Sequence, residues 1–308
     1  MLRETKVSPT LIDEWIRWTG LPWTRAIVAV GLVLILLLLG AAYLDGVLIR
    51  PFDGYSWWDE LDGPAIIVYI LLVYRLLERF GLGAIEAFRP LVALDTDDFD
   101  RLLAGASVLD RRREWLAFGV GAAAGLLITR PWNLPGLFFW MTLYALLSRT
   151  LTFGLLGWVI YISLADSRRF AELHRQPLNI DIFDPTPLEP IARLSLGVSL
   201  AFIGGITLSV FLNPDPQELL SVPGLILYGT SILVAFLVFF LNMMSSHRVM
   251  AEAKEQELKL VRRNLAAMYN ELKERAAKDQ LQDMEALSDS ITAWLSYQKV
   301  IEDAPEWP

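Results

Sequence analysis

Six runs of apolar residues alternate with polar connections along the chain. They cover residues 26–44, 64–80, 115–130, 136–162, 192–212 and 223–243. Each run equals or approaches the ~20 residues that an α-helix needs to cross a bilayer. The run 115–130 is the weakest, because Pro131 follows it and charged residues precede it. The pattern predicts an all-α polytopic membrane protein with a six-span transmembrane domain over residues 26–244.

The sixth run leads into a polar segment without any helix-breaking residue. From Thr230 to Ala304 the chain contains neither glycine nor proline, the two residues that most often end a helix. We therefore expect the last span to continue into water as a long helix. This cytoplasmic helical extension of the last span would form a coiled-coil-like region over residues 245–308.

Two apolar stripes follow each other along this extension. The first is a seam with spacings of three and four residues, typical of a coiled coil: Leu258, Val261, Leu265, Met268 and Leu272. A second stripe begins at Met284, after a mostly polar stretch. Either one helix continues with a slipped seam, or the chain folds back as a hairpin. The stripes would pack on each other, on the cytoplasmic connections 81–114 and 165–191, or on a neighbouring subunit, where the first would be an assembly seam.

Residues 1–25 are predicted to contain a short amphipathic helix. Thr10 and Asp13 have the spacing of a capping box, and Leu11, Ile12, Trp15 and Ile16 then share one helical face. The tryptophans favour a cytoplasmic helix lying in the membrane interface. The alternative is an ordinary packed N-terminal helix.

Positive charges predict the orientation. Lysine and arginine are frequent in the N-terminal segment, in both connections 81–114 and 165–191 and in the tail, whereas the other connections have one or none. By the positive-inside rule, both termini are expected in the cytoplasm of a multi-pass protein of the cell inner membrane. The lipid bilayer is then its first partner, and no cleavable signal peptide is predicted.

Composition excludes several classes of function. Hydrophobic residues make up 54% of the chain, too many for a soluble domain of 308 residues. The absence of cysteine excludes disulfides and thiol chemistry. The net charge of −8 argues against a nucleic-acid partner. The two histidines, His174 and His247, have no ligand-spaced partner, so neither a metal site nor a cofactor is expected.

Arg149 is the candidate functional residue within an apolar run. A charge at that depth is costly and is by default a functional hypothesis. At 1.5 Å per residue from the outer rim, Arg75 and Glu78 of the second run reach a similar depth, so we expect Glu78 to be the counter-ion. Arg149 would then line a pore or an anion site. The alternatives are a buried structural pair with Glu78 and a position at the inner interface.

The connection 47–63 is predicted to form an outer acidic loop. Its carboxylates are Asp53, Asp59, Glu60 and Asp62, and Phe52, Tyr55, Trp57 and Trp58 accompany them. Such a loop concentrates cations at a pore mouth. Interfacial aromatic residues beside solvated carboxylates explain the same composition.

These patterns lead to three functional hypotheses. The first is an oligomeric channel or pore, in which Arg149 and the acidic loop serve permeation and the tail joins the subunits of a homo-oligomer. The second is a non-conducting membrane sensor or scaffold, whose cytoplasmic helices bind a protein partner. The third is a secondary transporter, although no run shows the mid-membrane interruption typical of that class. No phosphate-binding glycine loop, nucleophile elbow or zinc-protease helix is present, so we do not expect an enzyme.

Overall fold

The computed structural model describes most of the chain as helices. The described residues are 9–48, 57–92, 95, 98–99, 101, 110–133, 138–173, 183, 189–212, 220–277 and 284–304. All elements in these ranges are helical, which agrees with the predicted all-α class. They are α1 (Leu11–Thr19), α2 (Trp23–Leu44), η1 (Trp57–Leu61), α3 (Asp62–Phe88), α5 (Arg111–Thr129), η2 (Pro131–Asn133), α6 (Phe139–Leu173), α7 (Glu189–Leu212), α9 (Val222–Ala277) and α10 (Met284–Asp303).

Helices occupy all six of the predicted apolar runs. Four of them, α2, α6, α7 and the Gly224–Leu241 part of α9, are long and apolar enough to cross a membrane. The other two are more polar: α3 carries Arg75, Glu78 and Arg79 in its middle, and α5 begins with three arginines and Glu114. The chain therefore has the helices of a membrane protein.

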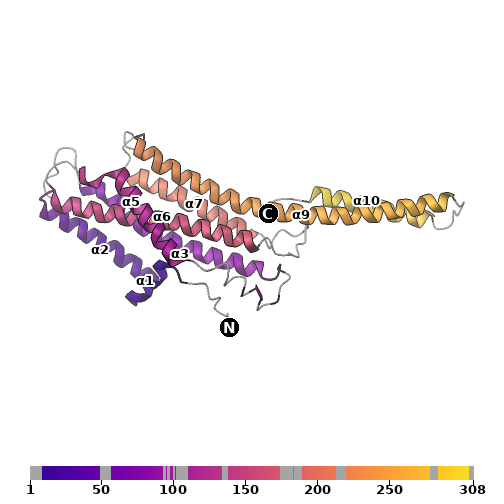
Figure 1. The fold of residues 1–308 in the computed structure, drawn as a ribbon, viewed down its shortest axis with the longest axis horizontal. Helices are drawn as coiled ribbons and strands as arrows, with labels where there is room; N and C mark the ends of the chain where they lie inside the picture. Colours follow the sequence, from indigo (N-terminus) through magenta and orange to yellow (C-terminus); the bar gives the residue numbers. More distant parts are fainter. Residues whose placement is uncertain are drawn as a thin grey trace.

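The helices form an elongated bundle from which the second half of α9 projects (Figure 1). At one end of the bundle, α2 finishes and α6 begins, and the Met141 amide donates a hydrogen bond to Asp45 Oδ2 over 2.7 Å. We name this the Asp45 end. The opposite end, where α6 finishes and α9 leaves the bundle, is named the hairpin end.

α2, α3, α5 and α6 pack around one apolar core. α5 and α6 approach most closely, because two glycines face each other there. A Cβ atom on Gly121 would lie 2.4 Å from the Phe153 carbonyl oxygen, and one on Gly157 would lie 2.6 Å from the Ala117 carbonyl oxygen. No side chain fits at either position, so these glycines fix the register of α5 along α6.

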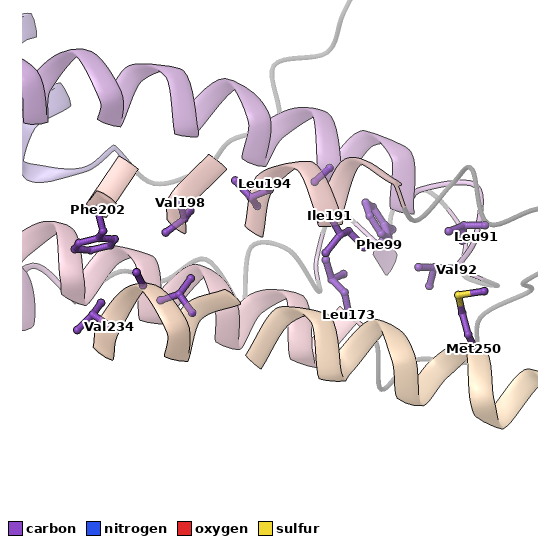
Figure 2. Packing of buried hydrophobic residues seen from close by; sticks show 13 residues of the cluster. Leu91, Val92, Phe99, Leu173, Ile191, Leu194, Val198, Phe202, Val234 and Met250 are labelled. Carbon is purple, nitrogen blue, oxygen red and sulfur yellow. The ribbon is translucent and has the colours of Figure 1, made fainter. Parts of the chain in front are cut away.

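A second core joins α3, α6, α7 and α9 and reaches beyond the apolar runs. Figure 2 shows Phe202, Val198, Leu194 and Ile191 in succession along α7. The same core includes Leu91, Val92 and Phe99 of the connection after α3, Leu173 of α6 and Met250 of α9. α3 and α6 therefore extend past the predicted starts of the connections at residues 81 and 165. The base of the projecting helix packs against both connections.

α9 is a single helix of 56 residues. The prediction that the last apolar run continues unbroken into the polar segment is confirmed, because the helix includes Ser245, Ser246 and His247. Of the two arrangements predicted for the tail, the structure has the hairpin. Lys254 Nζ donates hydrogen bonds to the Glu302 and Ala304 carbonyl oxygens, over 2.7 and 3.1 Å, so α10 returns toward the bundle along α9.

Candidate functional site

Arg149 pairs with two carboxylates at the start of α3. Its guanidinium nitrogens lie 3.4 Å from Glu60 Oε1 and 3.4 Å from Asp62 Oδ2. The Arg149 side chain is 22% exposed. Glu60 belongs to η1 and Asp62 is the first residue of α3, so the turn from η1 into α3 brings both acids to one guanidinium.

The prediction that Glu78 is the counter-ion of Arg149 was wrong. Glu78 pairs with Arg75, one turn earlier on α3, and Arg75 also lies 5.2 Å from the centre of the Trp23 ring. Glu78 follows Asp62 by 16 residues, which is ~24 Å along the helix. It therefore lies too far from Arg149 to be its counter-ion.

The error arose from the assumption that all spans begin at one level. Met141 of α6 lies beside Asp45, and Arg149 follows Met141 by eight residues, or ~12 Å. α3 begins only at that depth. Counting from a common rim therefore placed Arg149 too deep relative to α3.

Arg149 and the outer acidic loop, predicted as two separate candidate sites, lie together in the structure. Glu60 and Asp62, predicted as parts of the outer acidic loop, are the residues that bind Arg149. Asp53 lies outside the described residues, and the side chain of Asp59 is not among the described ones either. We name the group of Glu60, Asp62 and Arg149 the Arg149 cluster.

Three hydroxyl groups of α6 lie on the face that bears the Arg149 cluster. Tyr144, Ser148 and Thr152 follow one another at intervals of four residues and are buried. Thr152 Oγ1 and Asp62 Oδ1 have no hydrogen-bond partner among the described residues, and the Tyr144 and Ser148 hydroxyls have at most each other. A Cβ atom on Gly63 would lie 2.0 Å from Ser148 Oγ, so any side chain there would displace the Ser148 hydroxyl, and glycine lets α3 begin this close to α6.

A second polar centre surrounds Glu114, which the sequence analysis had not selected. Glu114 is 1% exposed, and its Oε2 accepts hydrogen bonds from Trp158 Nε1 over 3.0 Å and from the Leu11 amide over 2.8 Å. Arg111 Nη1 lies 3.7 Å from its other oxygen. The only sequence signal was an acid directly after three arginines, a pattern equally typical of a helix start in water.

Glu114 ties α1 to the bundle. α1 begins with the predicted capping box, formed by Thr10 and Asp13, and the Thr10 hydroxyl also forms a 3.0 Å hydrogen bond with Tyr74 OH. Ile12 and Ile16 of the predicted apolar face are buried against the bundle. Trp18, on the other side, is 85% exposed.

The predicted assembly seam is covered within one chain. Val261 and Leu265 are buried with Ile291 and Ile301 of α10, and Leu258, Met268 and Leu272 border the same cluster. The seam therefore holds the hairpin together. A further role of these residues in subunit assembly stays a prediction.

Comparison with known proteins does not indicate a function for this chain. No family model matches it, and the comparisons found no matching curated protein or solved structure. Within the described ranges, no group of three or more His, Asp or Glu side chains is placed to hold a metal ion. The two polar centres and the hairpin are therefore the basis for assigning a function.

Proposed function

We propose that this chain is a six-span membrane scaffold or sensor that presents its α9–α10 hairpin to a cytoplasmic protein partner. The continuity of α9 carries this proposal, because the Gly224–Leu241 segment and the first leg of the hairpin belong to one helix. A shift or tilt of that segment moves the hairpin with it. A flexible link between them would remove this coupling.

Packing of α3 and α5 supports six spans rather than four. α3 begins beside Arg149 and ends near the core that contains Leu173 and Met250. α5 runs in the opposite direction, from Glu114 beside α1 to Thr129 near η2. α3 therefore extends from the level of Arg149 to the hairpin end, and α5 extends from the level of α1 toward the Asp45 end. Their charges lie against protein partners: Arg75 against Glu78 and Trp23, Glu114 against Trp158.

The position of α1 supports an inner interface at the level of Trp23 and Tyr74. The two rings lie 5.8 Å apart, and Tyr74 lies 4.9 Å from Trp158 of α6. An exposed Trp18 is favourable where lipid headgroups meet acyl chains. In this arrangement the hairpin end of the bundle, the hairpin and the N-terminal segment share the cytoplasmic side, in a multi-pass protein of the inner membrane.

A distance measurement between two spin labels tests the coupling. Because the chain has no cysteine, Leu237→Cys and Leu260→Cys give two unique label positions, both exposed on α9. The helix separates them by ~35 Å, and we expect one narrow distance distribution. Two glycines inserted after Ser246 should broaden it, whereas the matched control Ser246→Ala should not. A broad distribution in the unmodified helix would refute the proposed coupling.

Cysteine accessibility distinguishes six spans from four. With six spans, Arg101→Cys reacts with a membrane-impermeant maleimide from the same side as Glu285→Cys in the hairpin. If α3 and α5 do not cross, Arg101→Cys reacts from the opposite side, together with Trp58→Cys. All three residues are exposed. Only the first outcome agrees with the proposal.

A second candidate function is the predicted oligomeric pore. It is favoured by one observation: a partly exposed arginine, two carboxylates and three hydroxyls lie together ~12 Å from the Asp45 end of α6. Reconstitution in liposomes and measurement of ion flux test it. Flux that Arg149→Gln changes and Arg130→Gln leaves unchanged would support the pore over the scaffold. Absence of flux under all tested potentials and ions would remove the pore hypothesis.

A further inference from the structure

Ser148 and Thr152 differ from most of the helical hydroxyls that the structure describes. Serine and threonine in a helix commonly donate to the carbonyl oxygen four residues earlier. Ten of the described residues do so over 2.6–2.9 Å: Thr129, Thr142, Thr150, Ser167, Ser195, Thr207, Ser231, Ser290, Thr292 and Ser296. Ser148 and Thr152 make no such bond, although they are only 1% and 9% exposed.

Both hydroxyls face the start of α3. A Cβ atom on Gly63 would lie 2.0 Å from Ser148 Oγ and 3.9 Å from Thr152 Oγ1. Asp62 precedes Gly63, and its Oδ1 is buried without a partner while Oδ2 binds Arg149. The guanidinium therefore binds Oδ2 of the carboxylate, and Oδ1 stays buried in the bundle.

The chemistry of these atoms indicates the class of ligand. A buried polar atom without a partner is costly, so a group of them requires an occupant. Carboxylate and hydroxyl oxygens are the ligands of hard cations. Only one carboxylate oxygen is available, and Arg149 lies nearby, which disfavours a divalent ion. Bound water is the alternative occupant, because it also satisfies clustered polar atoms.

We propose that Asp62 Oδ1, Ser148 Oγ and Thr152 Oγ1 bind a small monovalent cation of the Na⁺ class, with Tyr144 OH as a fourth oxygen. Arg149 is a positioning residue in this site, because it fixes the Asp62 carboxylate through Oδ2. The site does not depend on the role proposed for the hairpin, and it is compatible with either candidate function.

Thermal unfolding of the purified protein in nanodiscs tests the site, with tryptophan fluorescence as the signal. At constant ionic strength, NaCl in place of choline chloride should raise the midpoint by about 2–4 °C and the rise should saturate. Ser148→Ala and Thr152→Val should each lose most of this rise. Thr150→Ala is the matched control, since Thr150 lies on the same helix but bonds to the Leu146 carbonyl, and it should keep the full rise.

Binding of radioactive sodium to the unmodified protein gives a second readout that requires no variant. Bound label displaced by unlabelled Na⁺ but not by choline supports the site. Equal midpoints in Na⁺, K⁺, Li⁺ and choline, with no specific label bound, would overturn it in favour of water. An equal loss of the Na⁺ effect in Thr150→Ala would also overturn it, because the effect would then not come from these hydroxyls.

Discussion

Glu114 is buried and Arg149 is partly buried, and the two charges have different surroundings in the bundle. Glu114 receives two neutral hydrogen bonds, from Trp158 and from the Leu11 amide, and is closed off from water. The buried Arg111 Nη1 beside it has no hydrogen bond among the described residues but lies 3.7 Å from its carboxylate. Arg149 is partly exposed, and beside it Asp62 Oδ1 and Thr152 Oγ1 have no partner among the described residues, while Tyr144 and Ser148 have at most each other. A satisfied polar network stabilises a fold, whereas a partly satisfied one is costly unless something fills it. The difference indicates that Glu114 serves structure and that the Arg149 cluster is the candidate site.

Glu114→Ala tests the structural side of this comparison and should have the largest effect. It removes the acceptor of the Trp158 indole and of the Leu11 amide, so we expect a loss of about 3 kcal/mol in unfolding free energy. Denaturant unfolding followed by tryptophan fluorescence measures it. The control Glu114→Gln keeps one acceptor oxygen and should lose less than half as much. An unchanged stability of Glu114→Ala would show that Glu114 is not structural.

Gly121→Ala tests the register of α5 along α6, on which the position of Glu114 beside Trp158 depends. Its new Cβ atom would meet the Phe153 carbonyl, and overpacking of this kind costs about 2 kcal/mol. Gly119 has open space at the same point, so Gly119→Ala should be neutral or slightly stabilising. The same unfolding assay compares the two variants. Equal effects would mean that the close approach does not fix the register.

Arg149→Gln tests the functional side. Water reaches Arg149, but Glu60 and Asp62 are only 4% and 13% exposed, so removal of the guanidinium should cost about 2 kcal/mol, still below the cost of Glu114→Ala. Asp62→Asn, added to Arg149→Gln, should recover part of the loss, since it removes a carboxylate left without its cation. If Arg149→Gln destabilised the protein as much as Glu114→Ala, the distinction between the two centres would fail.

Glu255→Gln concerns an exposed pair on the hairpin and should have the smallest effect. A hydrogen bond from Lys259, over 2.8 Å, lowers the pKa of the Glu255 carboxyl from its ordinary 4.5. A lowered pKa in the folded state stabilises the protein above pH 4.5, and the effect is lost as the pH falls through the folded value. At pH 7 the substitution should shift the midpoint by about 1 °C or less. The shift should shrink as the pH falls below 4.5.

The parts of the fold that depend on local sequence were predictable. The capping box at Thr10 and Asp13 forms as expected, and α9 continues because no glycine or proline interrupts it. In both cases the determining residues lie within one or two helical turns. Whether the tail continued or folded back depended on residues far apart in the sequence, so the pattern allowed both.

The partners of the buried charges were not predictable in the same way. The pairing of Arg149 depends on where α3 begins relative to α6, and Gly63 permits that offset through its contact with Ser148. Hydropathy locates an apolar run along the chain but does not give its displacement along the bilayer normal. Glu114 was missed for a related reason, since its acceptor role depends on α1 folding back onto α5.

The length of α9 beyond the apolar segment turns small rotations into large excursions. Beyond Met250, which packs in the bundle core, the helix forms a lever arm of ~40 Å as far as Ala277. A tilt of about 5° at Met250 displaces the far end by about 3.5 Å, more than half the pitch of one helical turn. Lys254 binds the C-terminal end of α10 close to this point. The two helices of the hairpin therefore move as one unit. In the proposed function, a partner bound to the far end of the hairpin would therefore respond to motions of the membrane helices that are too small to alter the packing of the bundle.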